Sequence, residues 1–455
     1  MNDQRQLMRA CLSCLAAALL AAMAAMAAMA AQAAGLSAIA RKPKVDVYAE
    51  PKLEAMKIAA LDQNTAVSIE AQSGLWYEVK LPNGKAGFIR VNDVRMEYAA
   101  SEDAGASLRA LMGGQAGKGR VTETAGVRGI DESDLKSATL NRAQLDAMVS
   151  QRAQEPAAES YASARGWQAT KVAFESEAKP GKDSALSASG ATAQASNIAQ
   201  GASRFLGSLG QTVGGLLGVA KKAAPKPERD QAAEELALGP EIAGRVLGAR
   251  PLWNDPGAQQ RVNIVGRWVA SQTSRPELPW TFGVIDSAEV NAFAAPGGYI
   301  LVTRGLYELL TTDSEVAAVL GHEISHCVER DHYNVIRKQE LATLGKETLS
   351  AEIHTGTSAP ETYAREYVDK TGAAVMLTAL DRDAEFRADQ ASEVYLARSG
   401  MNPLALYSVL QKMAALGAKS ASLAALYKTH PPIDARLDRI DERGYKGLEG
   451  YTTRE

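Results

Sequence analysis

The sequence predicts an α+β protein with a mostly helical domain that contains a small β-sheet, preceded by a small all-β module and a low-complexity linker. Three observations support this prediction. Short apolar runs separated by turn residues between residues 44 and 97 are typical of strands. Apolar residues recur at helical spacing over much of residues 235–445. Residues 98–234 are rich in Ala, Gly and Ser, as linkers are, and residues 446–455 form a short tail.

Residues 1–33 have the pattern of a secretory signal peptide. Arg5 and Arg9 precede an apolar run from residue 10 to residue 31, and Ala31-Gln32-Ala33 is typical of a signal-peptidase site. We expect cleavage after Ala33 and a periplasmic protein. A retained anchor is the alternative, because the apolar run is nearly long enough to span a bilayer. After cleavage only Cys327 remains, so no intramolecular disulfide is expected.

Residues 44–97 predict a compact β module in which Pro82-Asn83-Gly84 marks a hairpin turn. The sequences Gly74-Leu75-Trp76-Tyr77-Glu78-Val79 and Gly84-Lys85-Ala86-Gly87-Phe88-Ile89 resemble motifs of bacterial SH3-like domains. That resemblance implies a small barrel that binds peptides or cell-wall material. Trp76 and Tyr77 can belong to a ligand site or to the core, and we expect at least one of them to be in the core.

Two segments of the predicted linker, residues 98–234, differ from their surroundings. Residues 131–148 predict one amphipathic helix, with Asp131-Glu132-Ser133-Asp134 as its start. Residues 205–217 are apolar but rich in glycine, and basic residues flank them. They can contact a membrane surface peripherally or dock a partner. A flexible linker is the better interpretation, because glycine weakens helices.

Residues 235–445 predict alternating helices and strands. We expect a helix around residues 260–270 and strands at residues 280–285, 291–294 and 299–303, the last two joined through Pro296-Gly297-Gly298. A strand pair beside a helix offers an edge to which an extended peptide can add as another strand.

The central motif is Gly321-His322-Glu323-Ile324-Ser325-His326, which reads H-E-x-x-H. His322 and His326 are four residues apart, so on a helix they project from one face and can bind one zinc ion. Glu323 lies beside them and can take a proton from a zinc-bound water as the general base. With 5 histidines and 53 acidic residues in 455, fewer than about one such match in a hundred chains is expected by chance.

The helix that carries this motif is well specified. Thr312 and Glu315 have the spacing of a capping box at its start. Its apolar stripe consists of Val316, Leu320, Ile324 and Cys327. Because that stripe lies opposite the histidines, we expect the helix to bury one side and present the metal pair on the other.

A catalytic zinc needs a third protein ligand. His332 lies six residues after His326, as in one zinc-peptidase motif, but Glu329 stands where that motif needs glycine. A continuing helix would carry His332 to the far side, so we interpret it as a polar helix-end residue. Glu385 and Asp389 share a face of another predicted helix. Glu385 can be the third ligand, and Asp389 can accept the free ring N–H of a ligating histidine. The alternative is that both residues belong to a solvated, charged face of this helix.

These motifs resemble, in this order, the HtpX and CAAX-prenyl-protease class of zinc peptidases. The matching sequences are the H-E-x-x-H motif, the Glu385 and Asp389 pair, Asn291-Ala292-Phe293 with Gly297-Gly298-Tyr299, and Thr429-His430-Pro431-Pro432. The resemblance covers residues 236–444 and implies a mostly helical gluzincin-type fold, one Zn²⁺ per chain and endopeptidase activity on proteins.

Residue by residue, the resemblance implies His322, His326 and Glu385 as zinc ligands and Glu323 as the base. It also implies Asp389 as a support of a ligand, and substrate binding by Asn291, Ala292 and Phe293. The sequence departs from the integral-membrane members, because its longest apolar run after the signal, residues 372–380, is too short to cross a bilayer. Cys327 follows the second histidine, and we interpret it as a small buried residue.

We assign His430 and Arg436 to the catalytic group, and His430 has three interpretations. It lies in a loop stiffened by Pro431 and Pro432, where an ordinary helix-entry residue would fit. Alternatively, it can fill the fourth position of zinc and close the site. It can also hydrogen-bond the oxyanion of the reaction, with Arg436 adding positive charge.

The sequence therefore predicts a zinc-dependent endopeptidase of the cell envelope, and the resemblance suggests a role in protein quality control. The alternative is a binding or chaperone-like protein that holds clients or cell-wall peptides with little cleavage. We favour the enzyme because a pure binder has no use for Glu323 between two ligands. Expected partners are protein or peptide substrates and a cell-wall or protein ligand of the SH3-like module. The net charge of −3 gives no reason to expect nucleic acid.

Overall fold

The computed structural model describes residues 36–97, 130–177, 227–347, 359–417 and 420–454. They belong to two compact units, residues 1–116 and residues 117–455. The predicted signal peptide and the glycine-rich residues 205–217 lie outside the described residues. No helix of the described parts has the length and apolar character needed to cross a membrane.

The first unit is a seven-stranded antiparallel sheet with the strand order β3-β2-β6-β5-β4-β1-β7. Its strands are β1 (Leu36–Ala40), β2 (Lys44–Tyr48), β3 (Lys57–Asp62), β4 (Ala66–Ser73), β5 (Trp76–Lys80), β6 (Ala86–Arg90) and β7 (Val94–Met96). The sheet begins eight residues before the predicted start at residue 44, because β1 pairs with both β4 and β7.

The aromatic residues of this unit lie mostly in its core. Tyr77 is fully buried and Trp76 is 9% exposed. The ring of Tyr48 meets the ring of Trp76 edge-on, with centroids 5.3 Å apart. The expectation that at least one of Trp76 and Tyr77 belongs to the core is confirmed for both. The predicted hairpin is also present, since Gly84 N–H donates to the carbonyl of Leu81 at 2.8 Å.

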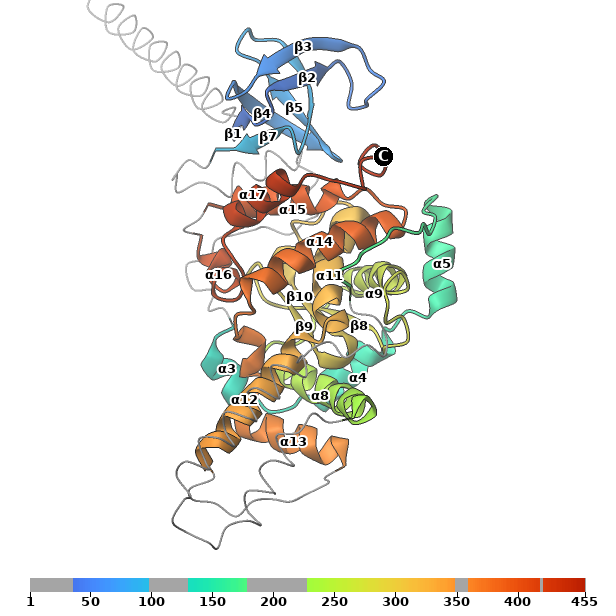
Figure 1. Ribbon diagram of the computed structural model, residues 1–455, viewed down its shortest axis with the longest axis vertical. Coiled ribbons are helices and arrows are strands. Elements are labelled where there is room, and N and C mark those ends of the chain that lie inside the picture. Colours follow the sequence, from blue (N-terminus) through green and yellow to red (C-terminus); the bar gives the residue numbers. More distant parts are fainter. Residues whose placement is uncertain (1–35, 98–129, 178–226, 348–358, 418–419, 455) are drawn as a thin grey trace, which may run out of the picture. The chain divides into compact units, whose positions relative to one another are not determined.

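The second unit is mostly helical around a small sheet, which confirms the α+β prediction (Figure 1). Its helices are α3 (Glu132–Ser137), α4 (Arg142–Ser150), α5 (Glu155–Ala164), α8 (Glu228–Ala249), α9 (Pro256–Ala270), α10 (Arg304–Tyr307), α11 (Asp313–Val328), α12 (Asp331–Glu347), α13 (Pro360–Thr371), α14 (Arg382–Arg398), α15 (Leu404–Ala414), α16 (Leu426–Thr429) and α17 (Ile433–Arg443). The described part of this unit also contains the 3₁₀ turns η1 (Pro296–Gly298), η2 (Ala374–Leu377) and η3 (Ala421–Leu423).

The small sheet has the strand order β8-β10-β9, formed by β8 (Thr281–Ile285), β10 (Tyr299–Thr303) and β9 (Ala292–Ala295). β10 runs parallel to β8 and antiparallel to β9, with Leu301 opposite Phe293. The three strands agree with the predicted ranges to within one residue. Gly297 and Gly298 make the turn between β9 and β10 with φ of 72° and 87°, angles that favour glycine. In the strand order β8-β10-β9, β9 is an edge strand.

α11, which carries the H-E-x-x-H motif, lies in the middle of this unit, packed between α9, α14 and α15 (Figure 1). The predicted capping box is confirmed, because Thr312 and Glu315 bond each other's backbone N–H groups. Every residue from Glu315 to Val328 is buried. The helix therefore buries its apolar stripe and also the face that carries the two histidines. α14 covers the histidine face, and Gly321 allows its close approach, since a Cβ there would stand 3.3 Å from Cα of Ser392.

Part of the predicted linker belongs to this unit. Residues 131–148 form two helices instead of one, because Asn141 caps α4 by accepting from the N–H of Gln144 at 3.1 Å. α5 packs on α9, and the Tyr161 hydroxyl donates to Asp313 at the start of α11 at 2.9 Å. α8 begins at Glu228, inside the range assigned to the linker. The start of α11 is thus contacted by α5, which the composition had assigned to the linker.

Candidate metal centre

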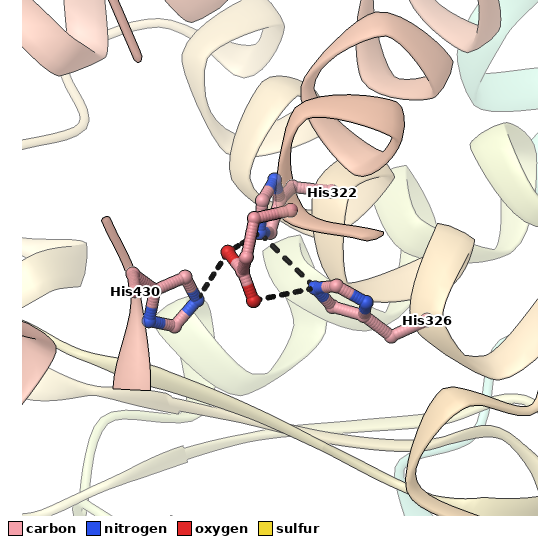
Figure 2. Close-up of side chains that lie close together, drawn as sticks. His322, His326 and His430 are labelled. Carbon is pink, nitrogen blue, oxygen red and sulfur yellow. Dashed lines mark hydrogen bonds and ion pairs between the residues drawn. The ribbon is translucent and has the colours of Figure 1, made fainter. Parts of the chain in front are cut away.

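Four side chains that can bind a metal converge in the second unit. They are His322 and His326 from α11, Glu385 from α14 and His430 at the C-terminal cap of α16. One ligand atom from each lies within 4.8 Å of all the others. Figure 2 shows the three imidazole rings pointing toward one another. The structure therefore brings together the three predicted ligands and adds His430 as a fourth.

The spacing of these atoms fits a tetrahedral zinc site. Nε2 of His322 lies 3.2 Å from Nε2 of His326 and 3.5 Å from Oε2 of Glu385. Oε2 of Glu385 also lies 3.6 Å from Nε2 of His430, and its Oε1 lies 3.7 Å from Nε2 of His326. Four atoms bound at about 2.0–2.2 Å to one tetrahedral zinc stand roughly 3.3–3.6 Å apart.

Glu385 gives an independent indication of a cation. Glu385 is 1% exposed, and its Oε2 has no hydrogen-bond partner among the described residues. Buried carboxylate oxygens are normally satisfied by hydrogen bonds or by a metal. Three imidazole nitrogens and one carboxylate are also a donor set that zinc favours. The residues present therefore fit zinc.

In His322, His326 and His430, Nδ1 lies within hydrogen-bond distance of an oxygen atom. Nδ1 of His322 lies 3.0 Å from Asp389, and Nδ1 of His326 lies 2.8 Å from Asp331. Because an ionised carboxylate only accepts, Nδ1 carries the proton in both rings and Nε2 is left free for a metal. Nδ1 of His430 lies 2.8 Å from the hydroxyl of Thr429. Asp389 was predicted in this position, but Asp331 and Thr429 were not.

Arg436 lies behind Asp389. Its Nε and Nη2 donate to the two carboxylate oxygens of Asp389 at 3.0 and 2.5 Å, and it is 4% exposed. Burial by itself would raise the pKa of Asp389, but Arg436 and His322 lower it to about 2. Arg436 does not line the cavity beside the ligand atoms. Arg436 was expected to add positive charge near the oxyanion, and in the structure its guanidinium binds the carboxylate of Asp389, which contacts His322.

His332 is also placed differently from the prediction. α11 ends at Val328, Arg330 adopts a left-handed backbone with φ of 58°, and α12 starts at Asp331. The chain therefore folds back instead of continuing as one helix. This turn brings Asp331 to His326 and leaves the ring centroid of His332 6.2 Å from that of His326. His332 is buried beside the metal ligands and does not lie on their far side.

A cavity of about 20 Å³ lies beside the ligand atoms. This is about the room that one water molecule needs. Its wall combines Glu323 and His326 from α11, Ala292, Phe293 and Ala294 from β9, His332, Met376, Thr378, Leu380, Glu385, Thr429 and His430. Burial raises the pKa of Glu323, and the nearby imidazoles of His322 and His326 reduce this increase. Asn291 is not part of the wall, because its side-chain oxygen accepts from the N–H of Ala292 inside the protein.

Comparison with known proteins agrees with this geometry. Residues 256–444 match the sequence model of Peptidase family M48. This part of the chain is therefore similar to M48 peptidase domains. M48 metallopeptidases depend on zinc, and the four-residue group above can hold it.

Three relatives show how far the similarity extends. The chain is 28% identical to the beta-barrel assembly-enhancing protease of Yersinia pestis, over 46% of this chain and 44% of that protein. It is 27% identical to metalloprotease LoiP of Escherichia coli, over 36% of this chain and 63% of LoiP. Protease HtpX of Pasteurella multocida is 26% identical over 46% of this chain and 81% of HtpX. The chain thus spans less than half the length of the beta-barrel assembly-enhancing proteases. The matching family model and these relatives are all named as peptidases or proteases.

Proposed function

We propose that this chain is a zinc-dependent endopeptidase that cleaves proteins in the cell envelope as part of protein quality control. The observation that carries the proposal is the convergence of His322, His326, Glu385 and His430 beside the buried carboxylate of Glu323. The envelope location is supported by the signal-peptide pattern and by relatives named as beta-barrel assembly-enhancing proteases. Quality control is the role that the resemblance to the HtpX class suggests.

In this proposal His322, His326 and Glu385 hold the zinc. Bound there, zinc supplies Lewis-acid chemistry, which polarises a peptide carbonyl and makes water acidic enough to attack it near neutral pH. Glu323 accepts the proton of the attacking water and returns it to the departing amine. Its raised pKa suits this exchange, because burial brings the pKa closer to the working pH. Asp389 and Asp331 keep the two imidazoles in the tautomer that leaves Nε2 for the metal.

The peptide substrate is proposed to bind along β9. Among the described strands β9 pairs only with β10, so its outer edge can accept the main chain of an extended peptide. Ala292, Phe293 and Ala294 of this strand also line the cavity that contains Glu323. A peptide added to this edge would therefore run directly past the general base. Asn291, which lies outside the cavity wall, would support the strand and not contact the peptide.

His430 is proposed to close the resting site. Its Nε2 belongs to the group of four ligand atoms, and burial lowers the pKa of its ring to about 3, so the ring is neutral and able to bind a metal. Four protein ligands would fill a tetrahedral zinc and leave no open position for the reaction. The cavity is also too small for a peptide. Substrate entry would then require His430 and the neighbouring wall to move outward.

The experiment that tests the proposed function is proteolysis of casein by the purified full-length chain with and without a chelator. We expect cleavage fragments without chelator, no cleavage after chelation, and recovery when zinc is added back. A binding or chaperone-like protein, the alternative, would bind casein and leave it intact under all three conditions. Cleavage that persists after complete zinc removal would contradict the proposal.

A further inference from the structure

His332 is a buried polar side chain that lines the cavity beside the metal-ligand atoms. It is 8% exposed, and its buried Nδ1 has no hydrogen-bond partner among the described residues. Buried ring nitrogens normally have a partner, because leaving one unpaired is unfavourable. Since His332 lines the same cavity as Glu323, a molecule bound in that cavity can supply the missing partner.

The imidazoles of the site form a row. The ring of His322 lies 5.5 Å from that of His430 and 4.8 Å from that of His326, whose ring in turn lies 6.2 Å from that of His332. His430 and His332 therefore flank the metal-binding pair from opposite ends. β9 forms a further part of the cavity wall, through Ala292, Phe293 and Ala294. A peptide on this strand that passes Glu323 would meet His332 on one side of the scissile bond and His430 on the other.

His332 is not a further metal ligand in this arrangement. The group of ligand atoms that lie within 4.8 Å of one another contains His322, His326, Glu385 and His430, without His332. Asp331, the residue before it, is directed to Nδ1 of His326 at 2.8 Å. His332 thus lines the cavity without belonging to the group of metal-ligand atoms.

The position of His332 is built by buried ion pairs. The turn that precedes it is held by Arg330, whose Nε lies 2.9 Å from the carboxylate of the fully buried Glu235. On the other side of the turn, Nη2 of Arg387 donates to both oxygens of Asp331 at 2.9 and 3.1 Å. These contacts fix the backbone on which His332 is carried, so the ring is held in the cleft before any substrate arrives.

The ring is suited to bind a peptide amide. A neutral imidazole has one N–H donor and one nitrogen acceptor. A peptide main chain offers the matching carbonyl and N–H at every residue except proline.

We propose that His332 is a substrate-binding residue that hydrogen-bonds the main chain of a peptide lying along β9, on the side of the scissile bond away from His430. This inference rests on the proposed endopeptidase function. It makes His332 a contact that sets the affinity and the register of the substrate, while Glu323 performs the proton transfer.

The test uses a fluorescent peptide that spans a mapped casein cleavage site. Its binding is measured by fluorescence anisotropy with the full-length zinc-loaded chain carrying Glu323→Gln, so that the peptide is not consumed. Adding His332→Phe, which fills the space without a polar atom, is expected to weaken binding about three- to tenfold, the effect of one hydrogen bond. Adding His332→Gln, which keeps a donor and an acceptor, is expected to retain most of the affinity.

Peptides in which one amide N–H at a time is replaced by an ester oxygen locate the contact. At the position that His332 contacts, the ester should weaken binding to the Glu323→Gln chain but have little further effect when His332→Phe is also present. In the active enzyme His332→Phe should raise KM with kcat nearly unchanged, because the contact is made before the chemical step. Zinc content and the thermal midpoint serve as controls for a purely structural effect.

The inference is overturned if His332→Phe binds the peptide as tightly as the parent chain, or if the variant loses zinc in proportion to its loss of binding. It is also overturned if all ester positions weaken binding equally with and without His332. These outcomes are separate from failure of the proposed function, which would appear as no zinc-dependent cleavage of casein by the wild-type chain.

Discussion

Nδ1 of His326 lies 2.8 Å from Oδ2 of Asp331, although α11 ends at Val328 between the two residues. The contact forms because Arg330 turns the chain back with a left-handed backbone. Arg387 of α14 binds the same carboxylate, so the helix that supplies Glu385 also supports the aspartate behind His326. Both metal-bearing helices therefore meet at Asp331.

Removal of this carboxylate should weaken the site. Asp331→Ala leaves Nδ1 of His326 without its acceptor, and we expect roughly a 10- to 100-fold loss of zinc affinity, as for other residues that orient a ligating histidine. Competition with a fluorescent zinc chelator measures the change. Asp383→Ala is the matched control, because Asp383 is an exposed aspartate of α14. Equal zinc affinity in the two variants would refute the role of Asp331.

The three ligands should each be needed for zinc. We expect His322→Ala, His326→Ala and Glu385→Ala to lose most of the one zinc per chain, since each removes one of the protein donors that hold the metal. Metal analysis after dialysis measures the content, and Asp383→Ala again serves as the control. A Glu385→Ala chain that keeps its full zinc content would refute the assignment of the third ligand.

His430→Ala distinguishes the two roles of this residue. If His430 fills the fourth position at rest, its removal should raise the initial rate of casein cleavage and replace a nitrogen ligand in the X-ray absorption spectrum of zinc. If it hydrogen-bonds the oxyanion, turnover should fall, by about a factor of 100 or more, with unchanged coordination. Unchanged turnover together with unchanged coordination would make His430 an ordinary loop residue.

Asp313, which contacts Arg261 of α9 and Tyr161 of α5, should link stability to pH. Burial by itself would raise its pKa, but Arg261, Tyr161 and Arg165 hold it below the ordinary value of 3.8. A pKa that is lower in the folded state stabilises the protein above pH 3.8, and this contribution disappears as the pH falls through the folded-state pKa. The site is partly exposed, so we expect only about 1 kcal/mol.

Thermal unfolding of Asp313→Asn against the wild-type chain measures this contribution. The variant should be less stable at pH 7, and the difference should shrink as the pH falls below about 4. A difference that stays constant from pH 7 to pH 3 would show that the charge of Asp313 is not its cause.

The local parts of the site could be predicted from the sequence. Residue spacing alone places His322 and His326 on one helix face, and the same reasoning pairs Glu385 with Asp389. Asp331 and His332 could not be placed this way, because their position depends on the single left-handed residue Arg330. A non-glycine residue rarely adopts that conformation, so the local sequence does not predict a turn at Arg330.

The linker shows a second limit. α5 is rich in alanine and has little apolar periodicity, so its composition resembles that of the surrounding low-complexity sequence. It is nevertheless folded against the domain through buried Ala158 and Ala162 and the contacts of Tyr161 and Arg165 with Asp313. Such a helix is stabilised by tertiary contacts, which single-sequence patterns do not reveal.

The measurement that tests the central claim most directly is casein cleavage by Glu323→Gln beside the wild-type chain, with zinc content determined on the same samples. Glutamine keeps the size of the side chain but cannot accept the proton of the attacking water. The variant is expected to hold one zinc per chain and to cleave at least about 100-fold more slowly, the effect of losing a general base. Cleavage at the wild-type rate by a zinc-loaded Glu323→Gln chain would contradict the account.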